Sequence, residues 1–259
     1  MNQWYQAVVP RDYAIEKFYQ TQGFLGSMER DNAMILYFEK TPEMKDKLKK
    51  LNLSVISEGD WVEKWREYFK PVKIGAFTVV PPWDCRSGNI VINPSRGFGT
   101  GHHETTRIAA GLIQKVLGSD SDIKAMIDVG TGSGILSIAA KKKRPDIKVA
   151  GIDSDLEAIE NAFENLVLND MVGEINFSSD PVFKFEKTFD VVVANIISSV
   201  LYSLKDDLKR LTGKWLILTG VLEIETEFLK KMDLGDFELI EEVSENEWRG
   251  FLFRRRENG

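Results

Sequence analysis

Two glycine-rich segments concentrate the residues of this chain whose types and spacing could do chemistry. One of them, DVGTGSG, runs from Asp128 to Gly134 and carries glycines at alternate positions after an apolar stretch. Because glycine has no Cβ, such a loop can turn tightly and let its backbone approach a ligand. A helix that begins near the last glycine would direct its free N–H groups at the same ligand. The spacing therefore predicts a nucleotide-cofactor loop. Its candidate contacts are Gly130, Thr131, Gly132 and Gly134.

Two carboxylates beside this loop discriminate between cofactor classes. Asp153 ends the next apolar stretch, VAGID, where an acid is placed to bind ribose hydroxyls. The glycine spacing is GxGxG rather than GxGxxG, and a carboxylate at Asp128 would repel a pyrophosphate. The same carboxylate suits a cofactor that carries an ammonium group, as S-adenosylmethionine does. We therefore expect S-adenosylmethionine, and the alternatives are a nicotinamide or flavin cofactor and a purely structural turn.

The other segment, GFGTGHHETT at residues 97–106, holds both histidines of the chain. Adjacent histidines point in different directions in most backbones, and no carboxylate–histidine cluster accompanies them, so we expect no metal site. His103 is expected to shape the cofactor or substrate pocket, with a local structural role as the alternative. Thr106 is a candidate cofactor contact. The pair Thr105 and Thr106 could instead be only a helix N-cap.

Asn195 follows the apolar run DVVVA, which places it at the carboxyl edge of a sheet, where ligands bind in open α/β folds. The alternative is a strand-end asparagine that caps the following helix. The expected cofactor, S-adenosylmethionine, is a methyl donor, and methyltransferases that act on amide or nucleobase nitrogens often have Pro-Pro after this position. Here Ile196 and Ile197 follow, so a lysine amine or an N-terminal α-amine fits better. Asp180 is placed either near an adenine or in an ordinary turn.

The elements that must position these residues alternate between strand and helix from about residue 102. Continuous apolar runs are typical of a parallel sheet with both faces covered. A three-residue link between the last two strands forces antiparallel pairing. The sequence predicts an α/β, Rossmann-like, mostly parallel sheet with an antiparallel C-terminal hairpin. The expected strands are 125–129, 149–153, 174–178, 190–196, 214–220, 237–243 and 247–255.

A small α+β domain is expected at residues 1–57. Strands at 4–9, 33–39 and 53–57 and helices at 11–23 and 42–52 are compatible with a split βαβ, ferredoxin-like module. The stretch 24–30 would have to supply its fourth strand with little pattern. Aromatic residues repeat every four positions in 58–71, which predicts a linker helix. Residues 72–259 would form the cofactor-binding domain, which opens on one strand from Val72 to Pro81.

Composition narrows the setting in which the protein acts. The chain has 259 residues, 43% hydrophobic and 29% charged, which is ordinary for a soluble protein. Its one cysteine, Cys85, permits no intrachain disulfide and fits a cytoplasmic location. No apolar run approaches the ~18 residues that span a bilayer. The net charge of −6 argues against DNA as a partner and is compatible with a basic protein substrate.

These motifs resemble a known family. Asp128 to Gly134 with Asp153 are similar to the cofactor motifs of class I S-adenosylmethionine-dependent methyltransferases. The chain also resembles the PrmA family, which methylates large-subunit ribosomal protein L-eleven. The segments that carry this resemblance are FGTGHHETT, DVGTGSGILSIAA, GIDSD, VVANI, LTGVL and an EW near the C-terminus. The likeness is continuous from about Gly59 to Phe253, whereas the first 55 residues match only in size and pattern. Gly97 departs from the family, which usually has alanine there.

The resemblance implies transfer of methyl groups to lysine side-chain and/or N-terminal amines of that ribosomal protein. It implies that the N-terminal domain grips the protein substrate. Apart from the resemblance, we expect the enzyme to be a monomer. It also places Thr106, Gly130, Asp153 and Asn195 against the cofactor. No catalytic base is indicated by the residues. The alternatives are a methyltransferase of another protein or of RNA, a nicotinamide dehydrogenase, and a non-enzymatic binding module.

Overall fold

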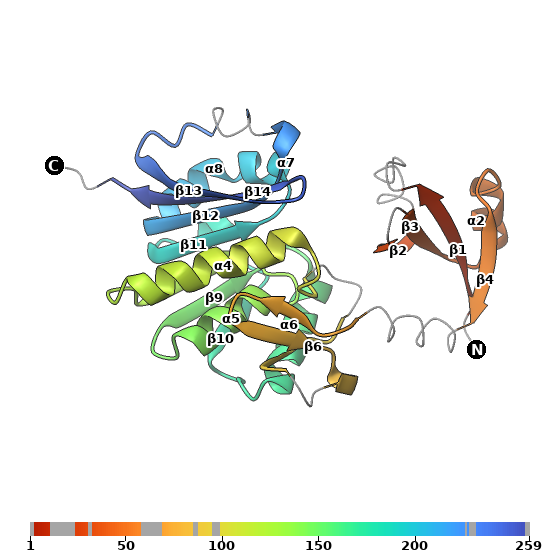
Figure 1. Ribbon diagram of the computed structural model, residues 1–259, viewed down its shortest axis with the longest axis horizontal. Coiled ribbons are helices and arrows are strands. Elements are labelled where there is room, and N and C mark those ends of the chain that lie inside the picture. Colours follow the sequence, from red (N-terminus) through yellow and green to blue (C-terminus); the bar gives the residue numbers. More distant parts are fainter. Residues whose placement is uncertain are drawn as a thin grey trace. The chain divides into compact units, whose positions relative to one another are not determined.

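The chain divides into two compact units, Met1–Lys70 and Pro71–Gly259, each of which is described by itself (Figure 1). This computed structural model describes residues 3–10, 24–30, 33–57, 69–84, 88–94, 99–225, 227 and 232–256. The predicted helix at 11–23 and most of the predicted linker helix at 58–71 lie outside these ranges, as does the single cysteine, Cys85. The start of the first glycine segment, including Gly97, also lies outside them.

The first unit contains a four-stranded sheet whose neighbouring strands are all antiparallel, in the order β2-β3-β1-β4. This is the strand order of a ferredoxin-like module, as predicted. The stretch with little pattern does form a strand, because it pairs with β3 from Phe24 to Arg30, with one irregularity between Phe24 and Gly26. Thr41 caps α2 by accepting the N–H of Met44 at 3.1 Å. The elements are β1 (Gln3–Pro10), β2 (Phe24–Arg30), β3 (Ala33–Glu39), α2 (Pro42–Lys47) and β4 (Leu53–Ser57).

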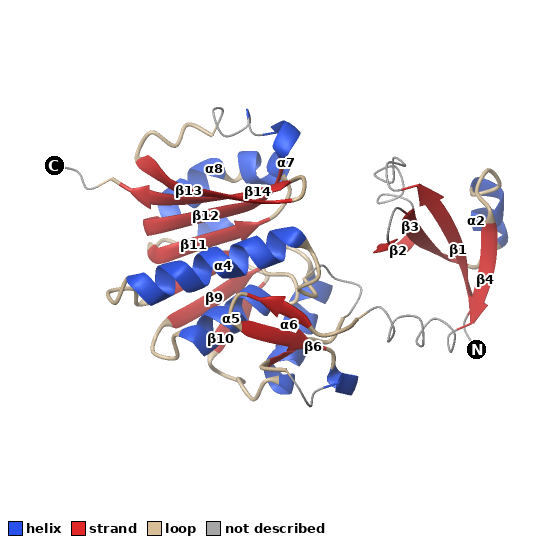
Figure 2. Ribbon diagram, viewed as in Figure 1, coloured by secondary structure: helices blue, strands red, loops and turns tan. Residues whose placement is uncertain are grey.

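The second unit is built on a seven-stranded sheet in the order β10-β9-β8-β11-β12-β14-β13 (Figure 2). The first five strands are parallel to one another, β14 runs antiparallel to β12, and β13 at the edge runs antiparallel to β14. The Rossmann-like fold and its C-terminal hairpin are thus confirmed. The strands are β8 (Ala125–Val129), β9 (Lys148–Ile152), β10 (Ile175–Ser178), β11 (Phe189–Asn195), β12 (Thr212–Leu222), β13 (Phe237–Glu245) and β14 (Trp248–Arg255).

Helices cover both faces of this sheet, which explains the continuous apolar runs. Val191 and Val193 of β11 face one core, with α4 (Glu104–Ser119), α5 (Ile135–Lys143) and α6 (Leu156–Leu168). Val192 and Ala194 face the other core, with α7 (Ser198–Ser203) and α8 (Lys205–Leu211). Because successive side chains point to opposite faces, the central positions of such a strand are apolar on both sides.

The predicted single strand from Val72 to Pro81 is wrong. The chain turns back after Ile74, so β5 (Val72–Ile74) and β6 (Phe77–Val80) form a hairpin, beside which β7 (Ile90–Val91) runs parallel to β6. Gly75 permits the turn, because its φ of +59° lies in the left-handed region that favours glycine. Gln114 of α4 closes it by accepting the N–H of Ala76 at 2.7 Å.

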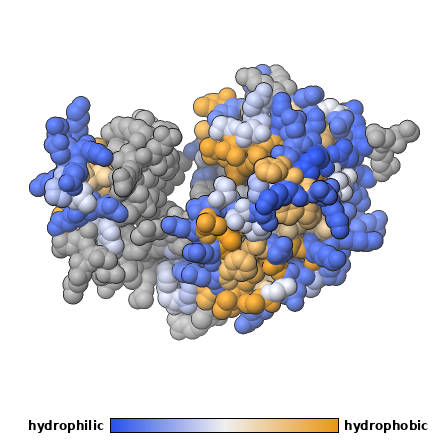
Figure 3. Space-filling model, turned by 180° about the vertical axis from the view of Figure 1, so that it is seen from behind, coloured by the Kyte–Doolittle hydropathy of each residue, from blue (hydrophilic) through white to orange (hydrophobic). Residues whose placement is uncertain are grey.

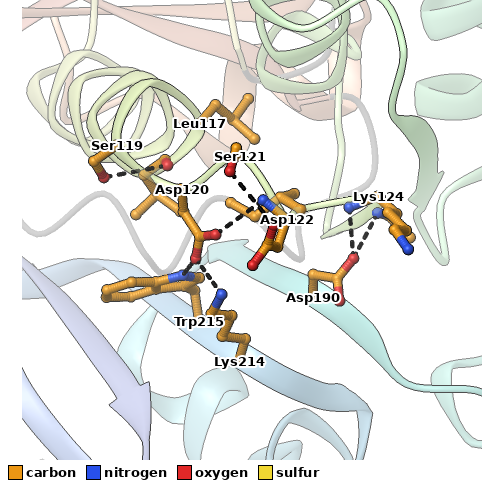
Figure 4. A network of polar contacts seen from close by, with 12 residues as sticks. Leu117, Ser119, Asp120, Ser121, Asp122, Lys124, Asp190, Lys214 and Trp215 are labelled. Atoms are coloured by element: carbon orange, nitrogen blue, oxygen red, sulfur yellow. Dashed lines mark hydrogen bonds and ion pairs between the residues drawn. The ribbon is translucent and has the colours of Figure 1, made fainter.

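A polar network fixes the C-terminal end of α4 where β8, β11 and β12 begin (Figure 4). The Oδ2 atom of Asp120 accepts a hydrogen bond from Trp215 Nε1 at 2.8 Å and lies 2.6 Å from Lys214 Nζ. Asp190 accepts the backbone N–H of Lys124 at 2.7 Å. With this end anchored at the amino edge of the sheet, the other end of α4 reaches the carboxyl edge.

The surface opposite α4 carries hydrophobic areas between hydrophilic ones (Figure 3). Three large exposed side chains follow strand ends in the chain: Phe183 after β10, Ile197 after β11 and Ile224 after β12. Ile224 is 88% exposed. None of the helices in the described ranges is long and apolar enough to cross a membrane.

Candidate active site

The sequence-predicted residues meet at the carboxyl edge of the main sheet. The chain proceeds outward from β8 to β9 and β10 and then returns to β11, so the strand order reverses between β8 and β11. Open α/β sheets bind ligands at such a switch point. The glycine loop follows β8, Asp153 follows β9, Asn195 ends β11, and Thr219 lies near the end of β12. The fold thereby gathers groups that lie far apart in the sequence.

The glycine loop has the conformation that its sequence predicts. Gly130, Gly132 and Gly134 all have positive φ angles, of 76°, 53° and 77°. The N–H groups of Gly130 and Thr131 both donate to the carbonyl of Ile152, at 2.8 and 2.9 Å. A Cβ on Gly130 would lie 2.4 Å from a methyl carbon of Ile196. This loop therefore requires glycine for its backbone angles and for the close approach of the β11 end.

Asp128 lies beneath the loop rather than at its surface, with a fully buried side chain. Its Oδ2 accepts hydrogen bonds from Thr131 Oγ1 at 2.8 Å and Ser137 Oγ at 3.0 Å. Its Oδ1 is buried and has no hydrogen-bond partner among the described residues. Burial raises the pKa of Asp128 to about 6, and the hydroxyl groups of Thr131 and Ser137 oppose the rise. The carboxylate therefore organises the loop from inside.

This buried acid also tests which cofactor the loop can accept. An acceptor oxygen without a partner leaves negative charge uncompensated in a low-dielectric interior. A cationic ligand above the loop would be stabilised by that charge, whereas a pyrophosphate would be repelled. The residues present fit S-adenosylmethionine, which carries an ammonium and a sulfonium.

Asp153 points its carboxylate back at the glycine loop. Its Oδ2 accepts the N–H of Gly132 at 2.9 Å, and its Oδ1 accepts the N–H of Asp155 at 3.0 Å. Asp155 has a different task, since its side chain caps α6 by accepting the N–H of Glu157 at 2.9 Å. Both carboxylate oxygens of Asp153 thus accept backbone N–H groups at the end of β9, one of them from the glycine loop.

Thr106, Asn195 and Thr219 form a hydrogen-bonded group across three elements. Thr219 Oγ1 donates to Asn195 Oδ1 at 2.9 Å, and Asn195 Nδ2 lies 3.4 Å from Thr106 Oγ1. Both threonines are fully buried. The capping alternative for Asn195 is wrong, because Ile197 occupies the N-cap position of α7.

His103, not the threonine pair, occupies the N-cap position of α4. Its Nδ1 accepts the N–H of Thr105 at 3.3 Å, while its ring meets that of Trp248 edge-on at 4.8 Å. Thr105 and Thr106 lie buried in the first turn, so the alternative that they cap the helix is wrong. Burial lowers the pKa of His103, which favours the neutral ring. Within the described ranges, no group of three or more His, Cys, Asp or Glu is arranged to hold a metal.

A hydrogen bond joins the two glycine segments. Ser133 Oγ donates to the carbonyl of Gly99 at 2.5 Å, and Gly99 has a φ of +108°. Asn165 of α6 supports this junction by donating to the carbonyl of Ser133 at 2.8 Å and accepting the N–H of Asn93 at 2.8 Å. Sequence reasoning missed these residues. Asparagines recur every fourth residue at 161, 165 and 169, and that spacing was the signal available.

Asp180 takes part in a local turn. Its carboxylate accepts Ser178 Oγ at 2.8 Å and pairs with Lys184 Nζ at 2.7 Å. The hydrogen bond from Lys184, followed by that from Ser178, holds the pKa of Asp180 below its ordinary value. The geometry favours the turn over the adenine alternative.

Comparison with known proteins identifies the family. A family model described as "Ribosomal protein L11 methyltransferase (PrmA)" matches residues 2–256. The chain belongs to this family. The match to the PrmA family begins at residue 2, so it includes the first 55 residues, where the motifs alone showed only similar size and pattern. The expectation of an S-adenosylmethionine-dependent protein methyltransferase is confirmed.

Individual PrmA relatives agree with the family match. A ribosomal protein L11 methyltransferase from Nitratiruptor sp. is 34% identical over 262 residues, which cover 93% of this chain and 91% of the relative. The one from Caldicellulosiruptor saccharolyticus is 35% identical over 207 residues, covering 77% of this chain and 67% of the relative. A crystal structure of ribosomal protein L11 methylase from Lactobacillus delbrueckii subsp. bulgaricus has a TM-score of 0.65 at 24% identity. It covers 73% of this chain and 100% of that one, and supports the fold.

Proposed function

We propose that this enzyme transfers methyl groups from S-adenosylmethionine to lysine side-chain and/or N-terminal amines of ribosomal protein L11. The observation that carries the proposal is the convergence, at one edge of the sheet, of a cationic-ligand loop and the Thr106–Asn195 pair. The PrmA relatives act on that ribosomal protein by name. The absence of Pro-Pro after Asn195 supports an amine rather than a nucleobase as the acceptor.

The chain's own residues would hold the cofactor in three places. The loop of Gly130, Thr131, Gly132 and Gly134, above Asp128, would bind its amino-acid part, and Asp153 would bind its ribose. Thr106 and Asn195 would bound the pocket on the side of β11, and His103 would shape its entrance. When bound, S-adenosylmethionine supplies an electrophilic methyl group on a sulfonium.

The protein contributes mainly by positioning and by excluding water. The acceptor amine must be neutral to attack, and removal from water together with a nearby cation lowers the pKa of an amine. A dedicated general base is therefore unnecessary, and we assign none. The fully buried Thr106 and Thr219 hold Asn195 between them, which supports a preorganised amide that would lie beside the reacting groups.

We further propose a division of labour in which residues 1–57 recognise the ribosomal protein, 58–71 link the domains, and 72–259 carry out transfer. The exposed apolar side chains that follow β11 and β12, Ile197 and Ile224, would add contacts for the protein substrate near the site. The enzyme is proposed to act as a monomer in the cytoplasm.

Methyl transfer from labelled cofactor to dissociated large-subunit ribosomal proteins, resolved by mass, tests the substrate. We expect label in ribosomal protein L11 and in no other component. Peptide mapping would then show whether lysine side chains, the N-terminal amine or both are modified. Label in RNA, or in a different ribosomal protein, would contradict the proposal and support one of the alternative acceptors.

Deletion of residues 1–57 tests the division of labour. The shortened chain keeps every residue of the cofactor site, so we expect its affinity for S-adenosylmethionine by calorimetry to stay within about twofold of the full chain. Transfer to ribosomal protein L11 should fall below detection, because the recognition surface is gone. If transfer survives the deletion, or if cofactor affinity is lost with it, the two units do not divide the work in this way.

A further inference from the structure

The tip of the C-terminal hairpin lies against the start of α4. Asn246, between β13 and β14, has a φ of +52°, and its Nδ2 donates to Glu104 Oε1 at 2.7 Å. The next strand begins with Trp248, whose ring contacts that of His103. These contacts join segments more than 140 residues apart in the sequence. The late EW motif thus belongs, in space, with the first glycine segment.

Arg107 is the centre of this junction. Its Nε donates to Glu245 Oε1 at 2.8 Å, and its Nη2 lies 2.6 Å from the same oxygen. Its Nη1 donates to the backbone carbonyl of His102, and Glu104 lies 3.7 Å from Nη2. A guanidinium presents its donors in a rigid fork. One side chain therefore fixes the relative positions of the loop before α4, the first turn of α4, and the hairpin.

The junction is coupled to the site through the adjacent residue. Thr106 precedes Arg107, and its N–H donates to the carbonyl of His103 at 3.1 Å. Its hydroxyl contacts Asn195 Nδ2 at 3.4 Å, so the start of α4 sets the distance between these two side chains. A helix start released from the hairpin would move Thr106 away from Asn195.

We propose that Arg107 is a positioning residue of the methyl-transfer site, which ties the hairpin tip to the His102 carbonyl and so holds Thr106 against Asn195. This inference rests on the proposed function only where kcat is measured, because that measurement needs the protein substrate. Arg107 touches neither Thr106 nor Asn195 with its guanidinium, and it acts through the backbone at the start of α4.

The same helix and strand provide a matched control. Lys115 of α4 pairs with Glu241 of β13 at 2.7 Å, with the lysine side chain 57% exposed. A groove of about 270 Å³, lined by Ile108, Gly111 and Val243 among others, separates this pair from the Arg107–Glu245 pair. Both pairs thus join α4 to β13 across one groove, but only the Arg107 pair also binds a loop of the site.

The test compares Arg107→Met with Lys115→Met in the full chain. We expect Arg107→Met to lower the affinity for S-adenosylmethionine in calorimetry and to lower kcat, each by about 10- to 100-fold, since a displacement of about 1 Å can have such an effect. Arg107→Lys should recover part of the loss, because its ammonium keeps the charge and can still donate to Glu245 but lacks the forked geometry of the guanidinium. Hydrogen exchange of the backbone amides at 99–106 should accelerate in Arg107→Met. Lys115→Met should match the wild type in all three measurements.

Wild-type affinity and kcat in Arg107→Met, or equal losses in Lys115→Met, would overturn the inference. Glu245→Gln weakens the same junction from the strand side and serves if Arg107→Met does not fold, as judged by circular dichroism. Normal affinity and kcat in Glu245→Gln would likewise count against it. Cofactor affinity is measured without ribosomal protein, so failure of the wild type to methylate L11 would contradict the proposed function separately.

Discussion

Asp153→Ala is expected to weaken the binding of S-adenosylmethionine by about 100-fold. Hydrogen bonds to a charged group contribute about 1.5–3 kcal/mol each, and a loss of about 3 kcal/mol corresponds to about two orders of magnitude in Kd. The substitution would remove the proposed ribose acceptor and also the oxygen that accepts the N–H of Gly132 at 2.9 Å. Calorimetric titration of the purified chain with the cofactor measures the change directly.

Asp155→Ala is the natural control, because Asp155 lies two residues away and caps α6 instead. Loss of this cap should lower the free energy of unfolding by about 1 kcal/mol and leave cofactor affinity unchanged. Asp153→Asn should fall between the wild type and Asp153→Ala, since it keeps one acceptor oxygen. Unchanged affinity in Asp153→Ala would mean that the ribose assignment is wrong.

The sequence predicted those parts of the fold that depend on local pattern. The apolar runs of β8 and β11 and the glycines at 130, 132 and 134 each imply a conformation through their own residue types. The strand at 24–30 was harder to predict, because its conformation comes from pairing with β3 rather than from its own alternation. The turn at Gly75 was missed because the residues on either side of it alternate as one strand would.

The candidate site was predicted residue by residue, but its internal contacts were not. Asn195 could be placed at the sheet edge from its position at the end of an apolar run, yet its partners Thr106 and Thr219 lie on other elements. His103, and not a threonine, is the N-cap of α4, and its ring contacts a residue far along the chain, Trp248. Such long-range contacts leave no local signal in a single sequence.

Asp128 differs from the other predicted cofactor contacts, because it is a buried ionisable group. Its ionisation therefore changes the free energy of unfolding. The folded-state pKa of about 6 lies above the ordinary value of 3.8. A raised pKa means that the folded state holds the proton more tightly, so the associated stability is complete below about pH 3.8 and is lost as the pH rises through about 6. The difference of about two pKa units corresponds to about 3 kcal/mol at most. At pH 8 the Asp128 carboxylate of the cofactor-free protein is therefore ionised although it is buried, and this charge destabilises the folded state.

Asp128→Asn is expected to remove this penalty. The variant keeps an oxygen that can accept from Thr131 and Ser137, so the loop should retain its shape. Its Tm without cofactor should exceed that of the wild type at pH 8 by several degrees, and this advantage should shrink as the pH falls towards 4.5. Differential scanning calorimetry of both proteins across this range measures the change, and acid effects of other groups cancel between them.

Cofactor binding should respond in the opposite direction, because the ionised carboxylate stabilises a cation above the loop. At pH 8 Asp128→Asn should bind S-adenosylmethionine at least tenfold more weakly than the wild type. Wild-type affinity should decline as the pH falls through about 6, while the affinity of the variant should change little there. A variant that is more stable and yet binds the cofactor as tightly as the wild type would show that the buried charge serves no ligand. If Asp128→Asn is instead less stable than the wild type at pH 8, the loop depends on the negative charge of the carboxylate, and an uncharged side chain of the same shape cannot replace it.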